Sequence, residues 1–373
     1  MKCLRHGIRL KMLLAMAIAA VMLPGWQTVE RDRAGFTARA ASASGQPVSP
    51  RPPGMRAETE RAIQRGLAYL ASTQRSDGSW RTHGGQGNYP VAMTSMAGIA
   101  LLAGGNTPSE GPYAANVRRA VNYIVRAADR NSGLIARRGE EQRPMYAHGF
   151  SMLFLAEVYG METDPRLQER IRQILNRAVK LTSESQSTYG GWYYTPDSSN
   201  DEGSVTITQV QGLRACRNAG ILVPAETIEQ STEYIEKSAN DDGGIRYTAR
   251  RGGNSLPAIT AQAVASLNNA GEYEHPVGQR SMEYIRNLMR GADNTRVFRG
   301  HYSYSIFYAS QAMYLSANED DWAWFYPMLQ NDLLDTQQDN GSWEGDFVGP
   351  TYGTATAVTA LALPYGYVPI FQR

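Results

Sequence analysis

The sequence predicts an all-α fold, an (α/α)6 toroid built from six helical hairpins. Three observations predict it. A glycine-containing turn recurs six times after residue 56. An amphipathic helix precedes each turn, and a helix of small and apolar residues follows it. The chain ends in an apolar segment, residues 364–373, that needs a surface to pack on. An open α-solenoid is the alternative, but it normally needs polar capping repeats, so ring closure is favoured.

The six turns define the repeat. Intervals of 53 to 57 residues separate the first five turns, and the last interval is about 41 residues. Two helices of roughly 14 residues with their connections fill such a period. In chain order the turns fall at Asp77-Gly78, Ser132-Gly133, Gly190-Gly191, Gly243-Gly244, Arg299-Gly300 and Asn340-Gly341.

The helix before each turn is amphipathic. In residues 61–73, Ile63, Leu67 and Leu70 form one apolar stripe and the arginines lie elsewhere. Such a stripe is typical of a helix with one face in water, so these helices should form an outer ring. The same pattern recurs in residues 118–129, 171–181 and 227–239.

The helix after each turn carries few charges and many Ala, Ser and Thr residues. A helix that is small or apolar nearly all round is buried on all sides, so these helices should form the inner ring. In chain order they cover residues 92–104, 149–160, 206–220, 258–271, 304–316 and 354–364.

The first 43 residues have the features of an export signal. A positively charged start precedes an apolar run, residues 12–23, and ARAASA at residues 38–43 offers small-residue cleavage sites. The apolar run is short for a membrane span, but the long gap before ARAASA leaves an uncleaved anchor as the alternative. We therefore predict an exported protein, periplasmic or extracellular. Residues 44–56 form a Pro/Ser/Gly-rich linker, and residues 57–373 form the toroid.

Charge and cysteine content narrow the classes of partner. After residue 43 the chain carries 30 Lys and Arg against 33 Asp and Glu, without a basic run. A nucleic-acid partner is therefore not expected. Cys216 is the single remaining thiol, which excludes an intrachain disulfide in the mature protein, and it lies deep in an inner helix. A metal site with cysteine ligands is not expected either, and no cofactor is predicted.

Gln and Trp recur around three of the turns, and this pattern resembles a known superfamily. The first unit matches the full spacing of the QW repeat of squalene and hopene cyclases. The resemblance covers about residues 57–373 and is to the α/α toroids of terpenoid cyclases and protein prenyltransferases, in a short exported version. The matching residues are Arg65-Gly66, Tyr69-Leu70, Gln74, Gly78 and Trp80, then Gln186, Gly190 and Trp192, then Gln337, Gly341 and Trp343.

The repeat has a physical role that concerns the fold. Glycine ends a helix where the backbone needs a positive φ, glutamine can bond to backbone at the helix end, and tryptophan covers the joint with a large apolar plate. Gln74, Trp80, Gln186, Trp192, Gln337 and Trp343 are therefore predicted to be structural. A fold shared with these families does not by itself give a function.

The resemblance implies a central cavity at the N-terminal ends of the inner helices. Hopene cyclases place an Asp-x-Asp-Asp cluster there to protonate a double bond, and this chain has no such sequence. Asp201 and Glu202, just before the third inner helix, are the nearest substitute and the candidate proton donors. Their alternative role is to place negative charge at a helix N-terminus.

Aromatic residues are the second feature expected of such a cavity, because their faces stabilise carbocations. The chain has 21 Tyr and 8 Phe. His148 is a candidate acid, base or ligand, although a hydrogen-bonded histidine at a helix start is the alternative. The predicted cavity residues are Tyr89, His148, Tyr194, Thr206, Tyr304, Tyr308 and Tyr352.

Three functions remain open from the sequence. The first is binding of an apolar isoprenoid-like molecule, with acid-catalysed isomerase or cyclase activity as an extension. The second is a non-catalytic scaffold for envelope proteins, and the third is a polysaccharide lyase or hydrolase. An enclosed aromatic pocket favours the first, a filled pocket the second, and an open groove with two facing carboxylates the third.

Overall fold

The computed structural model describes residues 51–82, 87–298 and 300–372, which lie in one compact unit, Pro50–Arg373. The predicted export signal and the start of the predicted linker lie outside the described residues. The described residues form twelve α-helices, three 3-10 helices and no strand. The α-helices are α1 (Ala57–Thr73), α2 (Pro90–Ala103), α3 (Ala114–Ala127), α4 (Pro144–Tyr159), α5 (Pro165–Glu184), α6 (Gly203–Asn218), α7 (Ala225–Ser238), α8 (Pro257–Ala270), α9 (Pro276–Met289), α10 (Tyr302–Tyr314), α11 (Glu319–Thr336) and α12 (Pro350–Ala362).

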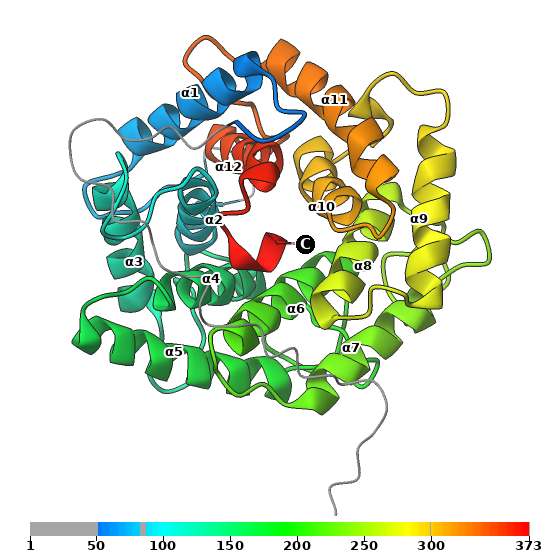
Figure 1. The fold of residues 1–373 in the computed structure, drawn as a ribbon. Helices are drawn as coiled ribbons and strands as arrows, with labels where there is room; N and C mark the ends of the chain where they lie inside the picture. Colours follow the sequence, from blue (N-terminus) through cyan, green and yellow to red (C-terminus); the bar gives the residue numbers. More distant parts are fainter. Residues whose placement is uncertain (1–50, 83–86, 299, 373) are drawn as a thin grey trace, which may run out of the picture. The chain divides into compact units, whose positions relative to one another are not determined.

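The even-numbered helices form a closed inner ring. Each contacts the next one in the chain, and α12 returns to contact α2 (Figure 1). The odd-numbered helices surround them. The predicted (α/α)6 toroid is thereby confirmed, and the open solenoid is excluded for the described unit. No α-helix among the described residues combines the length and the apolar character that crossing a membrane requires.

Burial follows the predicted division between the two rings. Every residue of α2 is buried, as expected for a helix packed on all sides. In contrast, α5 buries one stripe that includes Ile171, Ile174 and Leu175 and exposes its charged face. The small residues of the inner ring allow close helix contact. A methyl group added at Gly149 of α4 would lie 2.5 Å from the Thr208 hydroxyl on α6.

Most outer helices pack on the inner helix of the preceding hairpin. The contacts join α3 to α2, α5 to α4, α9 to α8, α11 to α10, and α1 to α12. At these joints the contact between hairpins also joins the two rings. The contact of α1 with α12 closes the circle between the first and last hairpins (Figure 1).

Gln74 and Trp80 lie at one such joint. The Gln74 side-chain N–H donates to the carbonyl oxygens of Gly78 and Asn116, both at 3.0 Å, which ties the turn to α3. The Trp80 indole N–H donates to the Leu70 carbonyl at 2.8 Å, and its side chain is buried. The same pairs of bonds recur at Gln186 and Trp192 and at Gln337 and Trp343.

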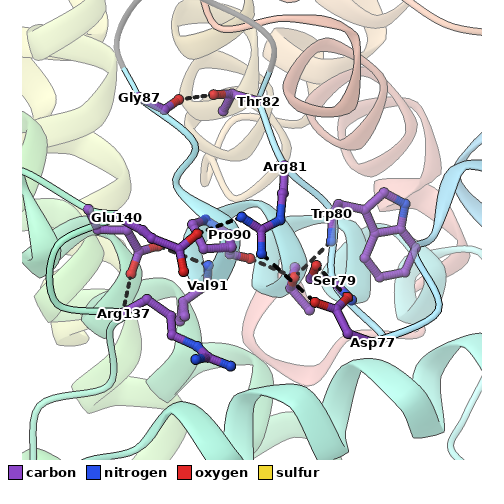
Figure 2. A network of polar contacts seen from close by, with 12 residues as sticks. Asp77, Ser79, Trp80, Arg81, Thr82, Gly87, Pro90, Val91, Arg137 and Glu140 are labelled. Atoms are coloured by element: carbon purple, nitrogen blue, oxygen red, sulfur yellow. Dashed lines mark hydrogen bonds and ion pairs between the residues drawn. The ribbon is translucent and has the colours of Figure 1, made fainter.

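Charged groups add to the first joint, which Figure 2 shows. Arg81 lies between Asp77 of its own turn and Glu140 of the next hairpin and forms ion pairs with both. Above this joint, the Thr82 hydroxyl donates to the Gly87 carbonyl. These residues connect the outer joint to the N-terminal end of α2.

The apolar C-terminal segment packs inside the ring, as its composition required. The 3-10 helix η4 (Pro369–Phe371) contacts α6, and Ile370 and Phe371 are buried. The Phe371 ring meets Phe307 of α10 edge-on at 6.4 Å between centroids. The Ile370 N–H donates to the buried Glu157 carboxyl at 3.3 Å. This segment lies in the centre of the ring in Figure 1.

Candidate functional site

A cavity of about 480 Å³ opens at the N-terminal ends of the inner helices. Its lining comes from the first two turns of the six inner helices and the loops that lead into them. The wall is mainly aromatic and aliphatic, with few polar groups. The lining residues with aromatic rings or long apolar side chains are Tyr89, Met93, Met96, Tyr146, Phe150, Tyr247, Leu256, Ile259, Tyr304, Phe307, Tyr308, Phe347, Val348 and Tyr352.

Helical periodicity explains which side chains reach the cavity. On α4 the lining residues are Arg143, Tyr146 and Phe150, a stripe of the i, i+3, i+7 type. On α6 they are Ser204 and Thr208, four residues apart. A residue two positions from a member of such a stripe points to the opposite side of the helix.

His148 and Thr206 occupy those opposite positions. His148 is buried against α5, where its Nε2 lies 3.0 Å from the Thr182 hydroxyl, and its Nδ1 accepts from the Ile135 N–H at 3.1 Å. Burial lowers the pKa of His148 to about 4, so the ring is neutral near pH 7. The Thr206 hydroxyl accepts from the Trp192 N–H at 3.1 Å. Neither residue lines the cavity.

The predicted tyrosines divide into two groups. Tyr89, Tyr304, Tyr308 and Tyr352 line the cavity. Tyr194 does not, but its hydroxyl is bonded to that of Tyr247, which does. Burial raises the pKa of Tyr304 and Tyr308 well above the usual value, so both stay protonated. Their hydroxyl oxygens have no hydrogen-bond partner among the described residues.

Carboxylates cap three of the inner helices at the cavity end. Glu141 accepts from the N–H groups of Val91 and Ala92 on α2. Glu202 does the same at the start of α6, and Asp346 accepts from the first two N–H groups of α10 at 3.1 and 3.0 Å. Negative charge is stabilised there by the free N–H groups and the helix dipole.

Glu202 is buried and linked by hydrogen bonds to the cavity wall. It accepts from the N–H groups of Ser204 and Val205 and from the Ser204 hydroxyl at 2.7 Å. The Ser204 hydroxyl is bonded in turn to the Tyr146 hydroxyl, and Tyr247 also bonds to Glu202. Burial raises the pKa of Glu202, while these hydrogen bonds oppose the increase. Glu202 therefore communicates with the cavity through Ser204, Tyr146 and Tyr247.

Asp201 points elsewhere. Its carboxylate accepts from the Thr248 hydroxyl at 2.7 Å and forms an ion pair with the Arg250 Nε at 3.0 Å. It is absent from the cavity lining. The two adjacent carboxylates are thus in different environments, with Asp201 neutralised by a cation and Glu202 held by neutral donors.

Backbone strain is concentrated at the cavity rim. Among the described residues, Tyr89 and Asp346 are the non-glycine residues with positive φ, at 36° and 53°. Both line the cavity. Such conformations cost of order 1–3 kcal/mol and are frequent at functional sites.

The sequence patterns did not identify Arg143, Ser204 or Asp346 as cavity residues. Arg143 directly precedes the proline that starts α4, Ser204 is the second residue of α6, and Asp346 lies four residues before α12. A position close to the start of an inner helix is the sequence signal that these three residues share with Glu202. Among the described residues, no cluster of three or more His, Cys, Asp or Glu side chains is placed to hold a metal ion.

Solved structures show the same architecture. The type II terpene cyclase MstE from Scytonema matches 84% of this chain and 98% of its own, with a TM-score of 0.57 and 15% identity. The fold is a terpenoid-cyclase-like α/α toroid. A protein from Actinoplanes gives a TM-score of 0.56 at 15% identity, covering 83% of this chain and 99% of that one.

Toroids of another chemistry are equally similar. A variant alpha-1,6-mannanase of a Salegentibacter species, in complex with alpha-1,6-mannotriose, gives a TM-score of 0.59 at 9% identity over 82% of this chain and 98% of its own. A variant of MstE is solved with geranylgeranyl dihydroxybenzoate, its substrate. No protein-family model and no curated protein matches the sequence. At these identities the likeness shows the toroid fold alone.

Proposed function

We propose that the protein binds an apolar, isoprenoid-like molecule in its central cavity. The observation that carries this proposal is the cavity of about 480 Å³ with its mainly aromatic and aliphatic wall. Ligand pockets in proteins are typically about 300–1,000 Å³ and are lined mostly by such side chains. The tyrosine faces suit an unsaturated chain, and they would stabilise positive charge on it.

The comparison with MstE supports the same ligand class, because that toroid takes a substrate with a geranylgeranyl chain. The mannanase comparison is less consistent with this site. Glycosidases of the usual kind need two carboxylates facing the scissile bond. The described lining of this cavity contains one, Asp346, and it is engaged by two backbone N–H groups.

Acid-catalysed isomerisation or cyclisation is the second candidate, favoured by the position of Glu202. With Glu202 protonated and the two hydroxyls turned toward the cavity, Tyr146 could give its proton to a ligand double bond while taking one from Ser204, and Ser204 would take one from the Glu202 carboxyl. The rearranged cation would lose a proton to the Tyr146 oxygen as Tyr146 and Ser204 each pass one back, which protonates Glu202 again. The test is incubation with farnesol and product analysis, with Glu202→Gln expected to abolish any product and keep binding.

Binding itself is tested by titrating farnesol into the purified protein. Met96 lies in the second turn of α2 on the cavity wall, so Met96→Trp should fill part of the cavity and weaken binding at least tenfold, about 1.4 kcal/mol. Leu222, which is 85% exposed, provides the control: Leu222→Trp should change nothing. Failure of farnesol to bind the wild-type protein would favour the scaffold function instead.

We also propose that the protein meets its ligand outside the cytoplasm. The support is the signal-like N-terminal sequence, with its basic start and short apolar run. Amino-terminal sequencing of the native protein would show whether the first residues have been removed.

A further inference from the structure

A cation without an acidic partner stands at the cavity mouth. Arg143 is the N-cap residue of α4, is exposed, and lines the cavity. Its guanidinium lies over the Tyr194 ring at 4.3 Å from the centroid. Within the described part of the chain no carboxylate lies within ion-pair distance of it, whereas Arg81 and Arg250 nearby are both paired.

The surroundings leave the charge of Arg143 available. The helix N-termini at α2, α6 and α10 are compensated by Glu141, Glu202 and Asp346. At the N-terminus of α4, the Arg143 guanidinium takes the place that a carboxylate has at the other three helices. The N-terminal end of the helix dipole adds further positive potential there. Asp346 is the one carboxylate of the described lining, and two N–H groups of α10 offset its charge.

Polarity falls steeply from the mouth inward along α4. Seven residues separate Arg143 from Phe150, both of which line the cavity, which corresponds to about 10 Å of helix at 1.5 Å per residue. The same change occurs on α10, from exposed His301 at the mouth to buried Tyr308 two turns deeper. A wholly apolar ligand would leave the polar mouth unused.

Resting on the binding function proposed above, we propose that the ligand is an amphiphile with an anionic head group, a carboxylate or a phosphate. Arg143 holds the head at the mouth, and the prenyl-like tail lies among Met96, Phe150 and Tyr308. The planar guanidinium offers paired N–H donors that match both kinds of oxyanion. Its stacking on Tyr194 limits the orientations it can adopt.

The experiment compares four probes that share one tail: farnesol, farnesoic acid, farnesyl phosphate and farnesylamine. Affinities are measured by calorimetry at pH 7.5 in 50 mM and 500 mM salt. At low salt we expect at least one of the two anions to bind ten times more tightly than farnesol, and the amine more weakly. The advantage should shrink at high salt, because the head group is close to solvent. The two anions show whether carboxylate or phosphate is preferred.

Variants assign the effect to Arg143. Arg143→Gln should remove the anion advantage, a loss of about tenfold in the ratio of anion affinity to farnesol affinity measured on the same variant. Arg143→Lys should keep part of the advantage, because it keeps the charge and loses the paired donors. Arg166→Gln, at an exposed position of the outer helix α5, is the control and should match the wild type. Melting temperatures establish that each variant is folded.

The outcomes separate the two proposals. Equal binding of farnesol and both anions, tighter binding of the amine, or an anion advantage that survives in Arg143→Gln would each overturn the head-group inference and leave apolar binding intact. Absence of binding by all four probes would overturn both proposals.

Discussion

Gly190 provides a sharp test of how the hairpins are joined. It lies in the turn between α5 and α6 with φ +94°, a conformation that favours glycine. A Cβ atom at this position would lie 1.9 Å from the carbonyl oxygen of Gln230 on α7. The neighbouring atom belongs to backbone, so a change of rotamer cannot relieve the contact. Gly190→Ala must therefore move one outer helix away from the turn.

The expected loss of stability has two parts. The left-handed conformation costs a non-glycine residue roughly 1–2 kcal/mol, and displacing packed backbone costs about 1–3 kcal/mol more. Gly220→Ala is the matched control, since Gly220 has φ +80° and no atom within 4 Å of an added Cβ. Gly220→Ala should lose only the stability that the left-handed conformation costs a non-glycine residue.

Urea unfolding and thermal melting of both variants measure the difference. We expect Gly190→Ala to be less stable than Gly220→Ala by about 2 kcal/mol. At roughly 2–4 °C per kcal/mol, its melting temperature should be about 4–8 °C lower. Equal losses in the two variants would refute the close approach of turn and helix that joins the third and fourth hairpins.

Two predictions concern buried titratable groups. Burial lowers the pKa of His148 from 6.5 to about 4, so its contribution to stability should be complete above pH 6.5 and lost as pH falls through 4. In urea titrations, the free energy of unfolding of the wild type should fall by about 3 kcal/mol relative to that of His148→Gln between pH 7.5 and pH 4. A difference between the two proteins that does not change with pH would contradict this prediction. Burial raises the pKa of Glu157 from 4.5 to about 7, so its contribution is complete below pH 4.5 and lost as pH rises through 7. Glu157→Gln should gain up to about 3 kcal/mol over the wild type between pH 4.5 and 8, and a stability difference that does not change with pH would contradict the raised pKa.

The fold could be predicted because one physical pattern repeats six times. Helix faces, turn glycines and small-residue inner helices all depend on local periodicity, which a sequence displays directly. The joints at Gln74 and Gln186 follow the same rule, since both side chains bond to the turn glycine carbonyl and to the next outer helix. Closure of the ring was predicted because the apolar C-terminal segment needed a surface to pack on.

The site was harder to predict because it depends on side-chain direction. Thr206 is two positions from both Ser204 and Thr208, and that offset turns it away from the cavity. Asp201 and Glu202 are adjacent on a loop, where no periodicity applies, and they point to different partners. Tyr304 and Tyr308 were predicted to face the cavity, and both line it on α10. That result identifies the cavity-facing side of α10 and says nothing about which side of the other inner helices faces the cavity.

Side chains packed inside the ring connect the fold to the orientation of the ligand. Gln211 of α6 and Gln311 of α10 are buried and hydrogen-bond to each other across the ring. Phe371 packs against Phe307, which itself lines the cavity. These contacts place packed side chains inside the ring, and the cavity lies at the helix N-termini. An amphiphile entering there must insert its tail first, because the deep wall offers few partners for a charged head, and desolvating that charge would cost several kcal/mol. The apolar deep wall and the cation at the mouth thus favour the same orientation for independent physical reasons.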